Sequence, residues 1–208
     1  KKEEEEKKEE EKNEEEEKKE EETKKEEEEE NIENEEKEET ETKEIDYETI
    51  LKWISKDKKI EKKLIYKATK DGDKASIFHS HCDNKGPTLS VITTDTGKVC
   101  GGYTTKNWDG SYSYRSDPDA FIFSLDKKKK YFPKEGLYSK YAIYCSSNEG
   151  PSFGWGDLSL CDCFLNHPNN HNQSYYYNFN TGELVGNVGN KNFSVKELEV
   201  YQIKILKD

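Results

Sequence analysis

The stretch GPTLSVITTDTGKVCGGYTTKNW (residues 86–108) decides the fold, together with SDPDAFIFSL (residues 116–125). Residues 89–94 are rich in β-branched side chains that alternate between two faces, a pattern typical of a strand. A turn at residues 95–97 follows, so we expect residues 98–105 to return as the second strand of a hairpin. Residues 120–125 are apolar on both faces, which predicts a strand inside a covered sheet, with Phe121 and Phe123 buried on one side.

Two glycines, Gly101 and Gly102, interrupt the return strand of this hairpin. Glycine in a strand interior weakens the strand, because it has no side chain to pack and loses more backbone entropy on folding. The pair therefore predicts either a β-bulge or a close approach of another group to the backbone.

The chain consists of two unlike pieces. Residues 1–44 hold 11 lysines and 26 glutamates, a net charge of −15, and Ile32 is their only apolar residue. The whole chain has 34 basic and 46 acidic side chains, so residues 45–208 keep 23 and 20, a net charge of about +3, together with all 24 aromatic residues. We expect residues 1–44 to be a low-complexity tail and residues 45–208 to form one domain of ordinary size.

The tail cannot bury enough apolar surface to form a core. Glutamates four residues before lysines favour an isolated, solvated helix, whereas runs of glutamate alone favour disorder, and both alternatives stay open. The absence of an apolar seam argues against a coiled coil. Since the first residue is lysine and not methionine, we expect the sequence to be a fragment of a longer chain.

The remaining segments alternate short apolar runs with turn signals. We expect strands at residues 64–68, 141–146, 157–161 and 195–205, and helices at residues 45–55 and 74–81. We expect connections at residues 56–63, 126–130, 150–156 and 166–174. Short strands at this spacing predict an α+β fold that is mainly β, a two-sheet antiparallel β-sandwich with a few peripheral helices.

Seven cysteine and histidine residues are potential ligands of a soft metal ion. Their spacing argues against a site, since Cys161 and Cys163 in a strand would point to opposite faces, and the two histidines around Pro168 lie in a loop. Buried thiols and solvated histidines are the favoured interpretation, so we predict no metal and no cofactor. The seven residues are His79, His81, Cys82, Cys161, Cys163, His167 and His171.

The sequence gives little support for a catalytic function. Cys82 with His79 or His81 could in principle supply a thiolate and its base, but nothing in the sequence places an acceptor or an oxyanion hole. The glycine-rich segments lack the following Lys-Ser/Thr of a phosphate-binding loop, and residues 117–119 offer too few oxygen ligands for calcium. We therefore predict a protein that is not an enzyme and has no catalytic residues.

Two further partner classes are disfavoured. Lys127 to Lys130 form one short basic run, which is typical of a solvated loop. The acidic tail would repel phosphates, so we expect no binding of nucleic acid. No apolar run reaches 18 residues, so we expect no membrane span. Five cysteines without disulfide spacing are typical of a reducing, intracellular compartment.

The residues resemble those of a known family. LIYKATKDGDKASIFHSHCDNKGPTLSVI, GKVCGGYTTKNW, SDPDAFIFSL, AIYCSSNEGPSFGWGDLSLCD and KELEVYQI follow one another as in the TLDc domain of protists, over residues 45–208. The resemblance implies a β-sandwich and a non-enzymatic interaction module that binds the vacuolar-type proton ATPase and is linked to oxidative-stress resistance. From the cysteine usage we expect a cytoplasmic protein, held at a membrane or cilium only through its partner. The alternative function is a structural attachment protein of a large cytoskeletal or ciliary assembly.

Three large aromatic residues lie on or beside the glycine-rich segments, where they either cap the core or face a partner. If one edge of them is exposed, they form a contiguous binding patch with the glycine pair at one end of the sandwich. The candidate protein-binding residues are Gly101, Gly102, Tyr103, Trp108, Phe153 and Trp155.

Overall fold

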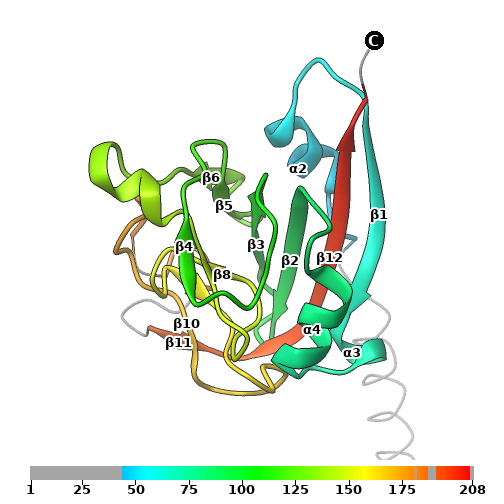
Figure 1. Ribbon diagram of the computed structural model, residues 1–208, viewed down its shortest axis with the longest axis vertical. Coiled ribbons are helices and arrows are strands. Elements are labelled where there is room, and N and C mark those ends of the chain that lie inside the picture. Colours follow the sequence, from blue (N-terminus) through cyan, green and yellow to red (C-terminus); the bar gives the residue numbers. More distant parts are fainter. Residues whose placement is uncertain (1–43, 181, 187–190, 207–208) are drawn as a thin grey trace, which may run out of the picture. The chain divides into compact units, whose positions relative to one another are not determined.

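The computed structural model describes residues 44–180, 182–186 and 191–206 (Figure 1). Asp46–Asp208 is one compact unit. The predicted tail lies outside the described residues except for Glu44, so its helical and disordered alternatives remain predictions. Within the described residues, no helix has the length and hydropathy that crossing a membrane requires.

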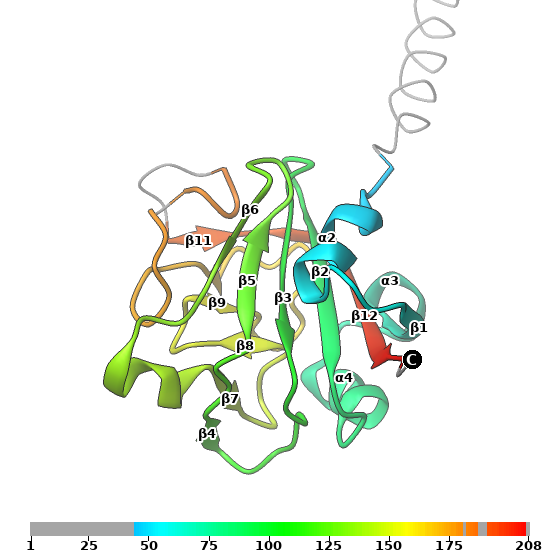
Figure 2. The same ribbon diagram turned by 90° about the horizontal axis from the view of Figure 1, so that it is seen from above.

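The described residues form two six-stranded antiparallel sheets, so the predicted two-sheet architecture is confirmed (Figures 1 and 2). The first sheet has the order β1 (Ile60–Lys67), β12 (Val195–Ile205), β2 (Thr88–Thr94), β3 (Val99–Thr104), β5 (Phe121–Ser124) and β6 (Lys129–Tyr131). The second has the order β11 (Asn192–Phe193), β10 (Asn170–His171), β9 (Leu158–Ser159), β8 (Ser152–Phe153), β7 (Ile143–Cys145) and β4 (Ser113–Arg115).

The helical segments among the described residues are short and lie around the sheets. They are α2 (Tyr47–Ile54), α3 (Ala68–Asp71), α4 (Ala75–Cys82) and the 3-10 helix η1 (Gly136–Tyr141). Helix α2 begins at Asp46, whose carboxylate accepts the backbone N–H of Thr49, and it buries Ile50. Both ribbon views place α2 beside β2 of the first sheet (Figures 1 and 2).

The first sheet is covered on both faces. Ile122 belongs to the core between the sheets, whereas Phe123 lies on the opposite face, where its ring is 5.8 Å from that of Trp53 in α2. Phe121 and Phe123 are both buried, as predicted, in a strand that has a neighbour on each side. Alternation in β5 therefore supplies apolar side chains to two separate packing layers.

The glycine pair in β3 provides room for one aromatic ring on each face of the sheet. A Cβ at Gly101 would lie 2.0 Å from the backbone oxygen of Ser90 and 2.8 Å from Cζ of Phe123, and one at Gly102 would lie 2.4 Å from Cζ of Phe153. The register between β2 and β3 has no shift, so the close approach of the Ser90 backbone and of these two rings, and not a bulge, is the reason for the pair.

The expected connections contain strands that the sequence pattern did not indicate. Residues 56–63 include the start of β1, residues 150–156 include β8, and residues 166–174 include β10. The start of β1 is largely exposed and forms through backbone pairing with the long strand β12. Pairing of this kind does not require an apolar face, which explains why a charged segment became a strand.

Candidate functional site

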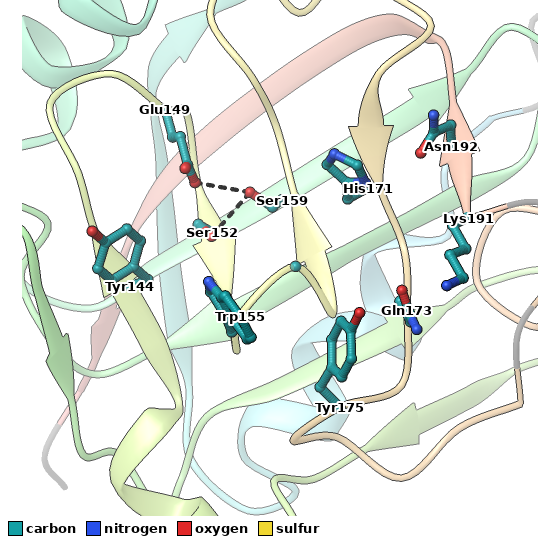
Figure 3. Close-up of a pocket in the computed structure, with 11 residues that line it drawn as sticks. Tyr144, Glu149, Ser152, Trp155, Ser159, His171, Gln173, Tyr175, Lys191 and Asn192 are labelled. Atoms are coloured by element: carbon teal, nitrogen blue, oxygen red, sulfur yellow. Dashed lines mark hydrogen bonds between the residues drawn. The ribbon is translucent and has the colours of Figure 1, made fainter.

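A pocket of about 300 Å³ lies on the outer face of the second sheet (Figure 3). Its floor follows from strand alternation, because each of five neighbouring strands turns one residue inward to the core and the next outward. The outward residues are Tyr144 in β7, Ser152 in β8, Ser159 in β9, His171 in β10 and Asn192 in β11. We call this the Trp155 pocket, after the tryptophan at its rim.

Small side chains in the middle of the floor and large ones at its rim create the hollow. Ser152 and Ser159 face each other across the β8–β9 pair, and their hydroxyls are 3.0 Å apart. Tyr144 stands on one side of these serines, while Trp155 and Tyr175 stand on another (Figure 3).

Trp155 occupies the turn between β8 and β9, with 62% of its surface exposed. Gly154 and Gly156, on either side, have φ of 66° and 81°, a left-handed conformation that glycine adopts without strain. The indole lies 5.9 Å from the ring of Tyr175, which is 43% exposed. The turn therefore presents two large aromatic side chains to solvent, and such residues are enriched at interfaces.

Asp157 fixes Tyr175 beside this turn. The carboxylate is fully buried, and its Oδ1 accepts the backbone N–H groups of Tyr175, Tyr176 and Tyr177 at 2.7–2.9 Å. Burial raises the pKa of Asp157 to about 6, although the donating amides act in the opposite direction. One acidic side chain thus joins the 173–177 loop to the β8–β9 hairpin.

The raised pKa of Asp157 predicts a pH-dependent stability. The folded protein binds the proton more tightly than the unfolded chain, whose aspartate has a pKa of 3.8, so stability falls as the pH rises from about 4 to about 6. The shift corresponds to about 3 kcal/mol. The free energy of unfolding of Asp157→Asn, measured by denaturant unfolding, should therefore rise by about this amount relative to that of the wild type between pH 4 and pH 7. Parallel pH profiles for the two proteins would contradict the assignment.

Among the described residues that line the pocket, Glu149 carries the one carboxylate. The Ser152 hydroxyl donates to Ser159, and the Ser159 hydroxyl donates to Glu149 Oε2 at 2.9 Å (Figure 3). The backbone of Glu149 is held by His79 of α4, whose Nε2 donates to the Glu149 carbonyl at 3.1 Å. His171 is paired with Ser159 in the sheet, but within the described residues no hydrogen bond joins its imidazole to either serine.

The six candidate binding residues do not form one exposed patch. Trp155 is exposed, whereas the other five are buried. Trp108 and Phe153 cap the core, with their rings 5.6 Å apart, and the glycine pair and Tyr103 lie in the interior strand β3. The accessible residues of the Trp155 pocket therefore include Trp155 and side chains that the sequence interpretation did not select, among them Tyr144, Glu149 and Tyr175.

Of the cysteine and histidine candidates, His171 lines this pocket, while Cys82, His79 and His81 belong to α4. Cys82 is buried, and burial raises the pKa of its thiol well above the usual range. His79 Nδ1 lies 2.7 Å from Asp83 Oδ1, and His81 Nδ1 lies 3.0 Å from the Ile65 carbonyl oxygen, so neither ring contacts the thiol through a hydrogen bond. In the part of the chain that the structure describes, no group of three or more His, Cys, Asp or Glu residues is arranged to hold a metal ion, and no disulfide joins the five cysteines.

Two of the four lysines in the basic run have partners within the domain. Lys130 donates to the Trp53 carbonyl at the end of α2, at 2.7 Å, and its ammonium lies over the ring of Phe121. Lys129 lies 3.7 Å from the Glu183 carboxylate. Two lysines of the run thus have a structural role, because they contact α2 and neighbours of β6.

The fold and the pocket define a class of protein: a two-layered antiparallel β-sandwich with an aromatic-rimmed pocket on one outer face. The profile of the TLDc domain family matches residues 36–204, more than half of the sequence, and the chain belongs to this family. The resemblance seen in the sequence is thus confirmed.

A similar curated protein is the MTOR-associated protein MEAK7 of Danio rerio, which is 20% identical over 87 residues. The aligned stretch covers 42% of this chain and 19% of that protein. The match therefore spans about a fifth of the relative's length.

Proposed function

We propose that this chain is a protein-interaction module without a chemical step of its own, which binds the vacuolar-type proton ATPase and supports resistance to oxidative stress through that pump. Family membership supports the class of function, since the TLDc resemblance implies binding to this pump. The name of the MEAK7 relative, which places that protein with MTOR, also fits a role in a larger assembly.

The observation that carries the proposal is the exposure of Trp155. A tryptophan with 62% of its surface in water forgoes the burial that usually stabilises such a side chain. Here two glycines and the buried Asp157 hold the turn and its neighbour Tyr175 in place, so the exposed aromatic pair is pre-organised. Pre-organised aromatic anchors lower the ordering cost of association.

The proposed test is capture of partners from cell extract on the immobilised full chain, followed by identification of the retained proteins. We expect subunits of the vacuolar-type ATPase on the wild-type chain and a loss of about tenfold or more with Trp155→Ala. Phe132→Ala is the matched control, because Phe132 is also exposed, at 47%, but lies beside β6 of the first sheet. Retention of cytoskeletal or ciliary proteins in place of pump subunits would contradict the pump proposal and favour the attachment function.

A further inference from the structure

The hydrogen-bond chain in the Trp155 pocket leaves acceptors facing the opening. Ser152 directs its hydrogen to Ser159, and Ser159 directs its hydrogen to Glu149 Oε2. Both serine donors are therefore used within the pocket, and Oε1 of Glu149 receives no hydrogen bond from the described residues. A ligand that brings donors suits such a lining, whereas one that brings only acceptors does not.

The carboxylate also lacks a counter-charge. No Lys, Arg or His among the described residues lies within ion-pair distance of Glu149, and the side chain is half-buried. Lys191 lines the same pocket, but it lies on the other side of His171 from Glu149 (Figure 3). A half-buried carboxylate is more stable beside a cation than alone, so the pocket favours a positively charged ligand.

The aromatic walls select among cations. In the view of Figure 3, Ser152 lies between the carboxylate of Glu149 and the indole of Trp155, so both border the same small opening. A guanidinium group is planar, stacks on an aromatic face and still donates hydrogen bonds in its own plane. An ammonium group is more strongly hydrated and lacks this flat shape, so it gains less from the same walls.

We propose that the Trp155 pocket takes an arginine side chain of the partner protein, with the guanidinium paired to Glu149 and stacked on Trp155. This inference rests on the proposed function, because it names the side chain through which the partner enters that surface. Arginine is enriched among interface anchors, and its pairing with a carboxylate is directional, so the pocket fixes the orientation of the partner as well as its affinity.

The test uses short peptides and the full chain, with the indole N–H signal of Trp155 followed by NMR and assigned with Trp155→Phe. Acetyl-Gly-Arg-Gly-amide should shift this signal saturably, with a Kd on the order of millimolar. The same peptide with citrulline, which has the shape of arginine without its charge, should bind at least about tenfold more weakly.

Glu149→Gln keeps the size of the side chain and an oxygen that accepts from the Ser159 hydroxyl. It should weaken binding of the arginine peptide by about tenfold. Glu61→Gln is the matched control: it removes an exposed carboxylate in β1 of the first sheet, outside the pocket, and should leave the affinity within about twofold of the wild type. The citrulline comparison requires no variant and remains valid if a substitution disturbs the fold.

Equal binding of the arginine and citrulline peptides, or full affinity in Glu149→Gln, would overturn the inference. A shift with a neutral oligosaccharide such as cellotriose and none with the arginine peptide would also overturn it and identify a sugar-binding face. These outcomes are separate from pump capture. If Trp155 is needed for pump capture but the arginine peptide does not bind, the proposed function stands and the arginine inference is rejected. If the arginine peptide binds but no pump subunits are captured, the arginine inference stands and the pump is rejected as the partner.

Discussion

Replacing Trp108 by alanine is expected to destabilise the domain by about 3 to 5 kcal/mol, the cost of removing a large buried aromatic side chain. Only 1% of Trp108 is exposed, and its ring makes edge-to-face contacts with Phe78 of α4 and Phe153 of β8. Its indole N–H donates to the Thr88 hydroxyl at 2.9 Å, so the substitution also leaves a buried hydroxyl without this donor. Denaturant unfolding of the wild type and the variant measures the loss.

The same substitution at Trp155 is the matched control for Trp108. Trp155→Ala should change the free energy of unfolding by less than about 1 kcal/mol, because the side chain is mostly in water. Two tryptophans near the glycine-rich segments are thus expected to respond in opposite ways. If Trp108→Ala unfolds at the wild-type midpoint, or if Trp155→Ala costs as much as Trp108→Ala, the division between core and surface is wrong.

Phe123→Ala is expected to cost about 3 to 5 kcal/mol, on the other face of the first sheet. The Phe123 ring occupies the space above Gly101 and contacts Trp53, so its removal opens a cavity between β3 and α2. Because strand and helix are both held by other contacts, the cavity should collapse only in part.

Phe123→Leu, which retains most of the apolar volume, should recover the larger part of the stability lost in Phe123→Ala. Thermal unfolding of both variants provides the measurement. A thermal midpoint of Phe123→Ala close to that of the wild type would show that this layer contributes little and that the assignment of β5 to the covered interior is incorrect.

The long strands could be predicted from the sequence because each carries an apolar face of its own. The hairpin of β2 and β3 and the C-terminal strand β12 alternate clearly, and the expected range 195–205 agrees with Val195–Ile205. The two-residue strands β8 and β10 could not be predicted, since two residues are too few to show a period of two. They form because neighbouring strands complete their backbone hydrogen bonds.

The pocket was less predictable than the fold, because its floor depends on the register of several short strands. Local sequence places Ser152 next to Phe153, but only the sheet brings Ser152 beside Ser159 and Ser159 beside His171. Tyr175 lies beside Trp155 because the backbone of its loop donates hydrogen bonds to Asp157, 18 residues earlier in the chain. The glycine-rich segments were the one local signal, and they pointed equally to Trp108, Phe153 and Trp155, of which Trp155 is exposed and the other two are buried.

The most direct test of the interaction surface is the affinity of the purified full chain for the purified cytosolic sector of the vacuolar-type ATPase, measured by biolayer interferometry. We expect Trp155→Ala to raise the Kd by at least about tenfold, equivalent to about 1.4 kcal/mol, and Phe132→Ala to leave it within about twofold. Absence of binding by the wild type, or an unchanged Kd in Trp155→Ala, would contradict the proposal that this face of the second sheet engages the pump.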